Sequence, residues 1–198
     1  MISCIVLSAG LSERFGSPKA LAEIQNEKVI ERIQHMLLTT SVAEIIIVLG
    51  HEADKIKPFL LKHKRIRFVY NKDYNLGQTS SFQTGLAGVD AQASGLMLLP
   101  VDYPFVNPQT IGQLVSEFNQ RKPLILIPTY QDKKGHPPIF STRLRNEFLA
   151  LEPSVGLNLI AKKYATEVAY FEVADAGVLK SFNTPEELRK LIDSSPRL

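Results

Sequence analysis

The sequence predicts an α/β protein in which a mostly parallel sheet lies between two layers of helices. Two observations support this prediction. Short, continuous apolar runs such as Ile2–Leu7 and Ile45–Leu49 are typical of strands that are buried on both faces. Segments with helical periodicity separate these runs, and that alternation is characteristic of parallel βαβ units. The chain has 198 residues, so we expect one domain spanning residues 1–198.

The expected strands alternate with helical patterns, and the run Ile45–Leu49 is rich in β-branched residues, which favour strands. Besides the two runs above, we expect strands at Arg67–Tyr70, Leu96–Leu99, Leu124–Ile127, Pro137–Ser141, Thr166–Val173 and Val178–Leu179.

The expected helices lie between these strands. We place them at Val29–Thr40, Glu52–Lys62, Gln78–Val89, Thr142–Leu151 and Val155–Lys163, with two more after Asn107 and after Thr184. Asn107 is a favourable N-cap and is followed by a proline at the first helical position. Thr184 and Glu187 have the spacing of a capping box. Pro58 interrupts the second helix.

Composition excludes several classes of protein. The net charge of +3 is small and argues against a dedicated nucleic-acid surface. The single cysteine, Cys4, cannot form an internal disulfide, which fits a reducing compartment. No apolar stretch approaches the roughly 18 residues of a membrane span. We therefore expect a cytoplasmic protein that binds neither membranes nor nucleic acid.

The most informative segment is the loop that follows the first strand, Leu-Ser-Ala-Gly-Leu-Ser-Glu-Arg-Phe-Gly-Ser-Pro-Lys. Small residues after a strand let backbone N–H groups approach an anion. Arg14 and Lys19 supply two cations that suit a polyphosphate. The alternative is an ordinary connection with two solvated charges.

Two other kinds of phosphate-binding loop do not fit this segment. A P-loop has glycine before its lysine and Ser or Thr after it, whereas Lys19 lies between Pro18 and Ala20. A dinucleotide fingerprint has three glycines at fixed spacing, and this loop has only Gly10 and Gly16.

Three further segments place polar residues after expected strands. Asp102 follows the fourth long strand, where a carboxylate either holds Mg²⁺ or makes an Asx turn. In Gly77–Ser81, hydroxyl groups either bind a ligand at a helix N-terminus or cap that helix through Thr79 or Ser80. His136 lies in a loop, where a lone histidine is more often solvated than in contact with a ligand.

The first loop resembles the signature Leu-Ala-Ala-Gly-x-Ser-x-Arg-x-Gly-x-x-Lys of nucleotidyltransferases with a molybdenum cofactor transferase-like fold, the MobA-like NTP transferase family. Within it, the chain is most similar to the molybdenum cofactor cytidylyltransferases. The resemblance implies a Rossmann-like, three-layer α/β/α fold of the nucleotide-diphospho-sugar transferase type. It also implies catalytic contacts from Arg14, Lys19 and Asp102.

The same resemblance assigns the remaining site residues. It implies that the nucleotide is bound by Leu7, Ser8, Ala9, Gly10, Asn71, Gly77, Ser80 and Ser81. It implies that the acceptor is bound by His136 and Pro137, and that Mg²⁺, the expected cofactor, is held by Asp102 and Asn183.

Two positions depart from the family pattern. Ser181 replaces an acidic residue, which leaves less negative charge near the expected metal. Asn158 replaces an arginine that faces the acceptor in cytidylyltransferases, so the acceptor can differ from the usual one.

The resemblance implies Mg²⁺-dependent transfer of a nucleoside monophosphate from an NTP to a phosphorylated acceptor such as molybdopterin, with release of pyrophosphate. CTP is favoured over GTP because Leu-Ser-Ala-Gly is closer to Leu-Ala-Ala-Gly than to the guanylyltransferases' Leu-Ala-Gly-Gly. A molybdoenzyme or a chaperone is a possible protein partner. The alternatives are a guanylyl or sugar-phosphate nucleotidyltransferase, or a module that binds a nucleotide or molybdopterin without chemistry.

Overall fold

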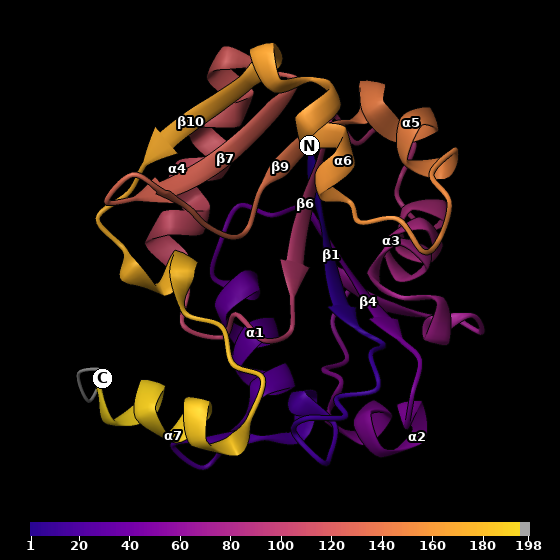
Figure 1. Cartoon of the computed structure of the whole chain (residues 1–198), viewed down its shortest axis with the longest axis vertical. Helices are drawn as coiled ribbons and strands as arrows, with labels where there is room; N and C mark the ends of the chain where they lie inside the picture. The colour runs from indigo at the N-terminus through magenta and orange to yellow at the C-terminus, as the bar shows by residue number, and fades with distance from the viewer. Residues whose placement is uncertain (195–198) are drawn as a thin grey trace.

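A computed structural model describes residues 1–194 of the chain. An eight-stranded sheet lies between two layers of helices, so the expected three-layer α/β/α fold is confirmed (Figure 1). The strand order is β10-β7-β9-β6-β1-β4-β5, with β8 paired to β7. All pairs are parallel except those made by β8 and β9.

The strands of the main sheet are β1 (Ile2–Ser8), β4 (Glu44–Leu49), β5 (Ile66–Tyr70), β6 (Gly95–Pro100), β7 (Ile125–Tyr130), β8 (Lys133–Lys134), β9 (Ile139–Ser141) and β10 (Val168–Glu172). A small hairpin consists of β2 (Glu23–Ile24) and β3 (Glu27–Lys28). The α-helices are α1 (Val29–Leu38), α2 (Ala53–Ile56), α3 (Gln78–Ala87), α4 (Pro108–Arg121), α5 (Arg145–Leu149), α6 (Asn158–Lys163) and α7 (Pro185–Asp193).

The central strand β1 is buried along its whole length because both of its faces are covered. Cys4 and Val6 point to the core beneath α1, α2, α4 and α7. Ile5 and Leu7 point to the core beneath α3, α5 and α6. The run from Ile2 to Leu7 is therefore apolar because helices cover both faces of the strand, as expected. The end of β1 lies in the middle of the molecule.

The two short antiparallel hairpins were not expected from the sequence. Each turns through two residues with positive φ, namely Gln25 and Asn26 in one and Gln131 and Asp132 in the other. Two successive positive φ angles are the geometry of a type I′ turn. The turns lack the Asn-Gly or Asp-Gly pair that signals such hairpins, so the strands beside them are hard to recognise.

Two expected elements are wrong in type or length. Val178–Leu179 is not a strand, because it belongs to a 3₁₀ helix, Ala176–Leu179, that Asp175 caps. The helix expected at Glu52–Lys62 ends at Ile56 and continues only as a 3₁₀ turn to Phe59. Pro58 lies in that turn, and a proline cannot continue an α-helix.

The helices expected in the C-terminal part are present but shorter. The segment Thr142–Leu151 begins with a 3₁₀ helix, and its α-helix α5 ends at Leu149. The helix expected from Val155 begins at Asn158. The expected α7 begins after Thr184, whose side chain accepts a hydrogen bond from the backbone of Glu187. The last residues, 195–198, of the expected domain lie outside the described residues.

The strand order changes direction between β1 and β6. From β1 the chain first adds β4 and β5 on one side, and then returns to add β6 on the other side. Ligands of open α/β sheets bind in the crevice outside the carboxyl ends of the strands at such a switch point. In Figure 1 the arrowheads of β1 and β6 point to the lower end of the molecule, near α2 and α7.

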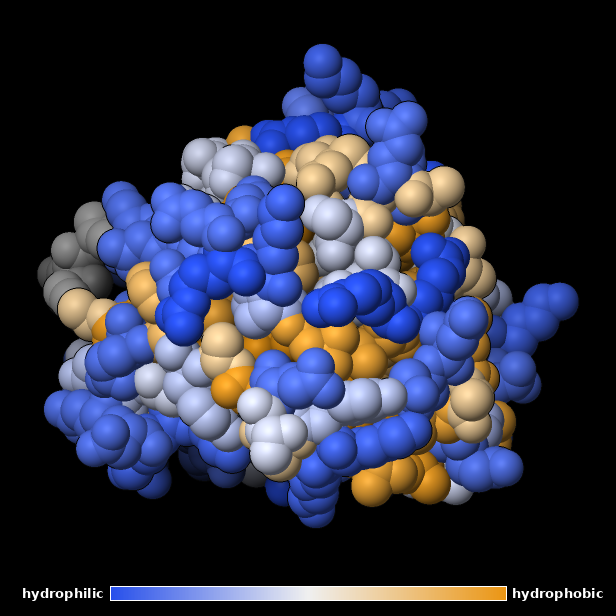
Figure 2. Space-filling model, turned by 90° about the horizontal axis from the view of Figure 1, so that it is seen from above, coloured by the Kyte–Doolittle hydropathy of each residue, from blue (hydrophilic) through white to orange (hydrophobic). Residues whose placement is uncertain are grey.

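The opposite end of the sheet presents a different surface. Figure 2 looks onto this end and shows hydrophilic side chains over most of the face, with some apolar side chains between them. No helix in the described part of the chain combines the length and the apolar character needed to cross a membrane.

Candidate functional site

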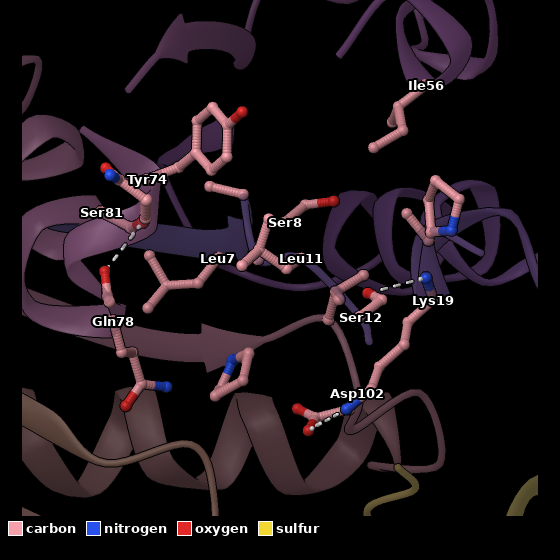
Figure 3. A pocket seen from close by; sticks show the side chains of 18 residues that line it. Leu7, Ser8, Leu11, Ser12, Lys19, Ile56, Tyr74, Gln78, Ser81 and Asp102 are labelled. Atoms are coloured by element: carbon pink, nitrogen blue, oxygen red, sulfur yellow. Dashed lines mark hydrogen bonds and ion pairs between the residues drawn. The ribbon is translucent and has the colours of Figure 1, made fainter. Parts of the chain in front are cut away.

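A cavity of about 310 Å³ lies at the switch point of the sheet. It is lined by the ends of β1 and β6, the loop after β1, and the start of α3 (Figure 3). The expected site residues that line it are Leu7, Ser8, Ala9, Gly10, Lys19, Gly77, Ser81 and Asp102. Segments far apart in the sequence thus meet in one hollow.

Close packing between β1 and β4 positions the start of the first loop. The Ala9 carbonyl accepts a hydrogen bond from the backbone of His51, at 3.1 Å. A Cβ atom on Gly50 would lie only 2.7 Å from the Ala9 oxygen and 2.6 Å from Cβ of Tyr74, so only glycine fits there. Gly10 has open space around it, which leaves its backbone accessible from the cavity.

The loop then closes on itself before it reaches Lys19. The Ser12 carbonyl accepts hydrogen bonds from the backbone of Phe15 and Gly16, at 2.9 and 3.0 Å. Ser12 and Gly16 both have positive φ. The Ser12 hydroxyl also accepts a hydrogen bond from the Lys19 backbone at 3.3 Å. The loop is therefore a compact turn that returns Lys19 to the mouth of the cavity.

The ammonium group of Lys19 lies between the two residues that were expected to hold a metal. Its Nζ atom is 3.2 Å from Oδ2 of Asp102 and donates to Oδ1 of Asn183 at 2.9 Å. The side chain of Lys19 is only 14% exposed and that of Asp102 is 22% exposed. The structure thus brings together Lys19, Asp102 and Asn183, and the ammonium group of Lys19 lies where the metal was expected.

Hydrogen bonds of the backbone hold the segments that carry Asp102 and Asn183 in place. The loop after β6 is tied to β1 because the backbone of Val101 donates to the Leu7 carbonyl at 3.0 Å. Asn183 precedes Thr184, the N-cap of α7, and its backbone donates to Oε2 of Glu187 at 2.6 Å. The Thr184 hydroxyl accepts from the backbone of Glu187 at 3.2 Å. Helix capping therefore holds Asn183 beside Lys19, at a second hollow next to the cavity.

Arg14 is exposed and lies beside a second hollow of about 290 Å³. This hollow and the first cavity share Leu11, Ser12 and Lys19 in their walls. An anion that extends from the first cavity into the second would therefore pass Lys19 and approach Arg14.

Asn71, Ser80 and Ser81 form a buried hydrogen-bonded cluster at the start of α3. The Asn71 amide donates to the hydroxyl groups of Ser80 and Ser81 at 2.9 and 3.1 Å. Of these three residues, only Ser81 lines the cavity. Asn71 and Ser80 therefore shape the wall without reaching the hollow. The simple capping alternative is wrong, because Gly77 occupies the N-cap position and no side chain caps it.

His136 and Pro137 do not line the cavity, although His136 lies close enough to Asp102 to interact with its charge. The His136 ring stacks on Tyr103 with centroids 4.4 Å apart, and a cis peptide bond joins it to Pro137. Burial lowers the pKa of His136, which the charge of Asp102 partly opposes. The expectation of a solvated histidine is wrong, since its Nδ1 atom is buried without a partner.

The structure adds cavity residues that sequence reasoning missed. Ile56 forms one side of the hollow, while Tyr74 and Gln78 form another (Figure 3). Asn75 also lines the hollow. Asn75 and Gln78 lie in the same segment as Gly77, so their amide side chains were detectable as candidates for recognising a base edge. Ile56 lies on α2, and nothing in its local sequence connects it with a ligand.

Burial excludes the single cysteine as a nucleophile. Cys4 is fully buried in β1, and burial raises the pKa of its thiol far above the usual value. The thiol therefore stays protonated, and reaction chemistry at this site depends on binding and charge rather than on a covalent intermediate at Cys4.

The donor set fits a divalent metal that arrives with a phosphorylated substrate. Asp102 offers a carboxylate and Asn183 a carbonyl oxygen, which are ligands for a hard cation such as Mg²⁺ or Mn²⁺. Within residues 1–194, no group of three or more His, Cys, Asp or Glu side chains is placed to hold a metal ion. Substrate oxygens and water would have to complete the coordination shell. The Lys19 ammonium shows that the two oxygens already attract a cation.

The fold and the site together define a nucleotidyltransferase, and comparison with known proteins supports this class. The family model described as "MobA-like NTP transferase domain" matches residues 4–168. The chain belongs to this family.

Curated relatives and solved structures extend the comparison. Nicotine blue oxidoreductase of Paenarthrobacter nicotinovorans is 24% identical over 96% of this chain and 96% of its own length. Probable molybdenum cofactor guanylyltransferase of Natranaerobius thermophilus is 26% identical over 73% of this chain and 67% of its own. Rv0371c of Mycobacterium tuberculosis H37Rv has a TM-score of 0.84 and 25% identity, with 98% of each chain covered. A second structure of that protein, a complex with manganese, has a TM-score of 0.81, 24% identity, and 98% and 99% coverage of the two chains.

Proposed function

We propose that the protein transfers a nucleoside monophosphate from an NTP, with CTP preferred, to a phosphorylated acceptor such as molybdopterin. The observation that supports this most strongly is the meeting of Lys19, Asp102 and Asn183 beside the cavity. One cation and two oxygen ligands at the mouth of a hollow suit a triphosphate with its metal. The function applies to one domain spanning the chain.

In the proposed reaction, an acceptor oxygen forms a bond to the α-phosphorus as the bond from that phosphorus to the β-phosphate oxygen breaks. Pyrophosphate leaves with the electron pair of the broken bond. Lys19 and Arg14 neutralise the β- and γ-phosphates and stabilise the leaving group. Asp102 and Asn183 would hold a divalent metal, which would supply Lewis-acid polarisation of the phosphate oxygens. Mg²⁺ is the proposed ion, and the manganese complex of Rv0371c supports divalent metal binding in this fold.

The nucleotide is proposed to occupy the main cavity. Leu7 to Gly10 line it, as do Gly77, Gln78 and Ser81. Asn71 and Ser80 act indirectly, since the Asn71 amide donates to the hydroxyl groups of both Ser80 and Ser81. Preference for CTP is supported by the Leu-Ser-Ala-Gly sequence, whereas the relative from Natranaerobius thermophilus carries a guanylyltransferase name. GTP is therefore the competing donor.

The acceptor is proposed to approach from the side of His136 and Pro137. Tyr103 belongs to the same surface, because its ring packs against His136. Asn158, at the exposed start of α6, cannot supply the cation that cytidylyltransferases place there. Sugar phosphates therefore belong among the acceptors tested. A cytoplasmic location and a molybdoenzyme or chaperone partner complete the proposal.

The test is pyrophosphate release from each of the four NTPs with Mg²⁺ or Mn²⁺, in the presence of molybdopterin or a set of sugar 1-phosphates. We expect release that requires both metal and acceptor, and that is fastest with CTP. Faster release with GTP would correct the base, and no release with any pair would contradict the transfer reaction.

A second candidate is a module that binds a nucleotide or molybdopterin without chemistry. Ser181 favours this alternative because it offers a hydroxyl instead of a carboxylate, so that within residues 1–194 Asp102 is the only carboxylate in contact with the Lys19 ammonium. Calorimetric titration with CTP and Mg²⁺ distinguishes the two. Tight binding without pyrophosphate release for any acceptor would favour the binding module.

A further inference from the structure

Lys19 occupies the position where a metal would have to bind. Its ammonium contacts Oδ2 of Asp102 at 3.2 Å and Oδ1 of Asn183 at 2.9 Å. In Figure 3 the side chain of Lys19 reaches across the mouth of the cavity to Asp102. The two oxygens that fit a metal are therefore already used by a protein cation.

A third group makes this position favourable for an ammonium ion in particular. The Nζ atom of Lys19 lies 5.6 Å from the centre of the Phe182 ring. That ring is fully buried and packs edge-on against Phe15, with centroids 5.4 Å apart. An aromatic face attracts an ammonium group but is no ligand for Mg²⁺ or Mn²⁺. Ser181, the residue before Phe182, adds no carboxylate for a metal.

A metal ion and the ammonium group exclude one another here. Both would need the same oxygens of Asp102 and Asn183, and their like charges would repel at a separation of about 3–4 Å. A divalent ion can enter only when Lys19 moves away. If Lys19 left these two oxygens without an anionic oxygen to move to, its ammonium group would lose both contacts.

A triphosphate would supply such an acceptor. The two hollows on either side of Lys19 share Leu11 and Ser12, and Arg14 lines the outer one. A phosphate chain that runs between these hollows passes within reach of the lysine and offers its ammonium group anionic oxygens. The same chain carries oxygens that complete the shell of a metal.

We propose that Lys19 blocks the metal position until a nucleoside triphosphate draws its ammonium group away, so that the metal enters only together with the nucleotide. This inference rests on the proposed function and describes how the same site is regulated. Because linkage is reciprocal, a nucleotide that displaces Lys19 raises the affinity for metal, and metal raises the affinity for nucleotide.

The test measures Mn²⁺ binding to the full-length protein without nucleotide, from the electron paramagnetic resonance signal of free Mn²⁺. Lys19→Met keeps most of the side-chain stem and removes the charge. We expect it to bind Mn²⁺ about tenfold more tightly than the wild type, a change that corresponds to about 1.4 kcal/mol. Lys19→Gln also removes the charge, so its affinity for Mn²⁺ should increase as well.

Two further variants locate the effect. Lys28→Met removes a lysine from the ion pair with Glu23, where Nζ and Oε1 are 2.6 Å apart, and should leave Mn²⁺ affinity unchanged. In the double variant Lys19→Met with Asp102→Asn, the gain should disappear. Circular dichroism and thermal unfolding check that each variant is folded.

Unchanged Mn²⁺ affinity in both folded Lys19 variants would overturn the proposal, and so would a gain that persists in the double variant. The Mn²⁺ measurement contains no nucleotide, so its result does not depend on the pyrophosphate assay. Failure of that assay with every NTP would overturn the transfer reaction, whereas the Mn²⁺ result would still decide whether Lys19 blocks the metal position.

Discussion

Single residues decide the chemistry of this site because few charged groups reach it. Lys19 and Asp102 are 83 positions apart in the sequence, and Lys19 and Asn183 are 164 apart, yet their polar atoms meet. Only one of the three is a carboxylate. The negative charge available for a metal therefore depends on Asp102.

Replacement of Asp102 by asparagine should strongly impair the transfer reaction. The variant keeps the size of the side chain but removes the charge that would hold a divalent metal. We expect kcat for pyrophosphate release to fall by on the order of 10²- to 10³-fold. Asp90→Asn, at an exposed aspartate in another loop, is the control and should behave like the wild type. Normal turnover by Asp102→Asn would show that the metal assignment is wrong.

Ser8 has an unusual position at the end of β1. Its hydroxyl is buried and has no hydrogen-bond partner in the described structure. Figure 3 shows that it points toward the side of the cavity where Ile56 lies, away from Gln78 and Ser81. A buried polar group without a partner costs about 1–3 kcal/mol.

Ser8→Ala should therefore stabilise the ligand-free protein, by about 1 kcal/mol in the free energy of unfolding. Ser3→Ala in the same strand is a matched control with the opposite expectation. The Ser3 hydroxyl donates to Oε2 of Glu44 at 2.7 Å, so its loss should destabilise the protein. Urea unfolding measures both changes. Destabilisation by Ser8→Ala would indicate that its hydroxyl has a partner in solution.

At the scale of elements, helix ends and helix pairs position the site. Helix α7 begins at Pro185, two residues after Asn183, and the hydrogen bond from the Asn183 backbone to Glu187 holds that residue. On the other face of the sheet, α5 and α6 are joined by Glu147, which pairs with Lys163 at 2.7 Å and accepts from the Tyr164 hydroxyl at 3.0 Å.

Thr184→Ala tests the cap of α7. The variant removes the hydroxyl that accepts from the backbone of Glu187. We expect the free energy of unfolding to fall by about 1 kcal/mol, the usual effect of an N-cap threonine. Urea unfolding measures the change, and Ser194→Ala at the other end of α7 should have a smaller effect. Equal effects of the two variants would contradict the importance of the cap.

The link between α5 and α6 should depend on pH. The hydrogen bonds from Lys163 and Tyr164 lower the pKa of Glu147 below its usual value of 4.5. A carboxyl group with a lowered pKa in the folded state stabilises the protein above about pH 4.5, and this contribution is lost as the pH falls through the folded-state pKa. Unfolding of the wild type and Glu147→Gln should therefore differ above pH 4.5 and converge in acid. A difference that is constant with pH would contradict this.

The whole molecule assembles the site from both halves of the chain. β1 and its loop come from the N-terminus, Asp102 follows β6, and α7 lies near the C-terminus. The unfolded chain cannot present these groups together, so a nucleotide should bind only the folded state. Ligands that bind only the folded state raise its stability by mass action.

Thermal unfolding should report this coupling. A nucleotide at about 100 times its dissociation constant adds about 2.7 kcal/mol, which is roughly 5–10 °C in Tm for a chain of this size. We expect CTP with Mn²⁺ to shift Tm more than CTP without metal, and cytidine to shift it least. Equal shifts for cytidine and CTP would show that the triphosphate makes no net contribution to binding.

The sequence alone determined the fold class, and it pointed to most residues of the candidate site. Continuous apolar strands such as β1 require cover on both faces, and this local pattern is enough to predict a parallel sheet between helices. Gly10, Arg14 and Lys19 form one uninterrupted motif, so they too were recognisable. The boundaries of strands that depend on turn geometry were not recognisable, as the hairpin at Gln25 shows.

Only the tertiary structure decided which of these residues meet. It placed the Lys19 ammonium against Asp102 and Asn183, directed Asn71 and Ser80 into a supporting cluster, and added Ile56 to the cavity wall. These contacts depend on strand order and on the close packing of strand ends, and neither is encoded in the spacing of residues along one segment. The sequence therefore determines the chemical groups, and the packing of the sheet determines their neighbours.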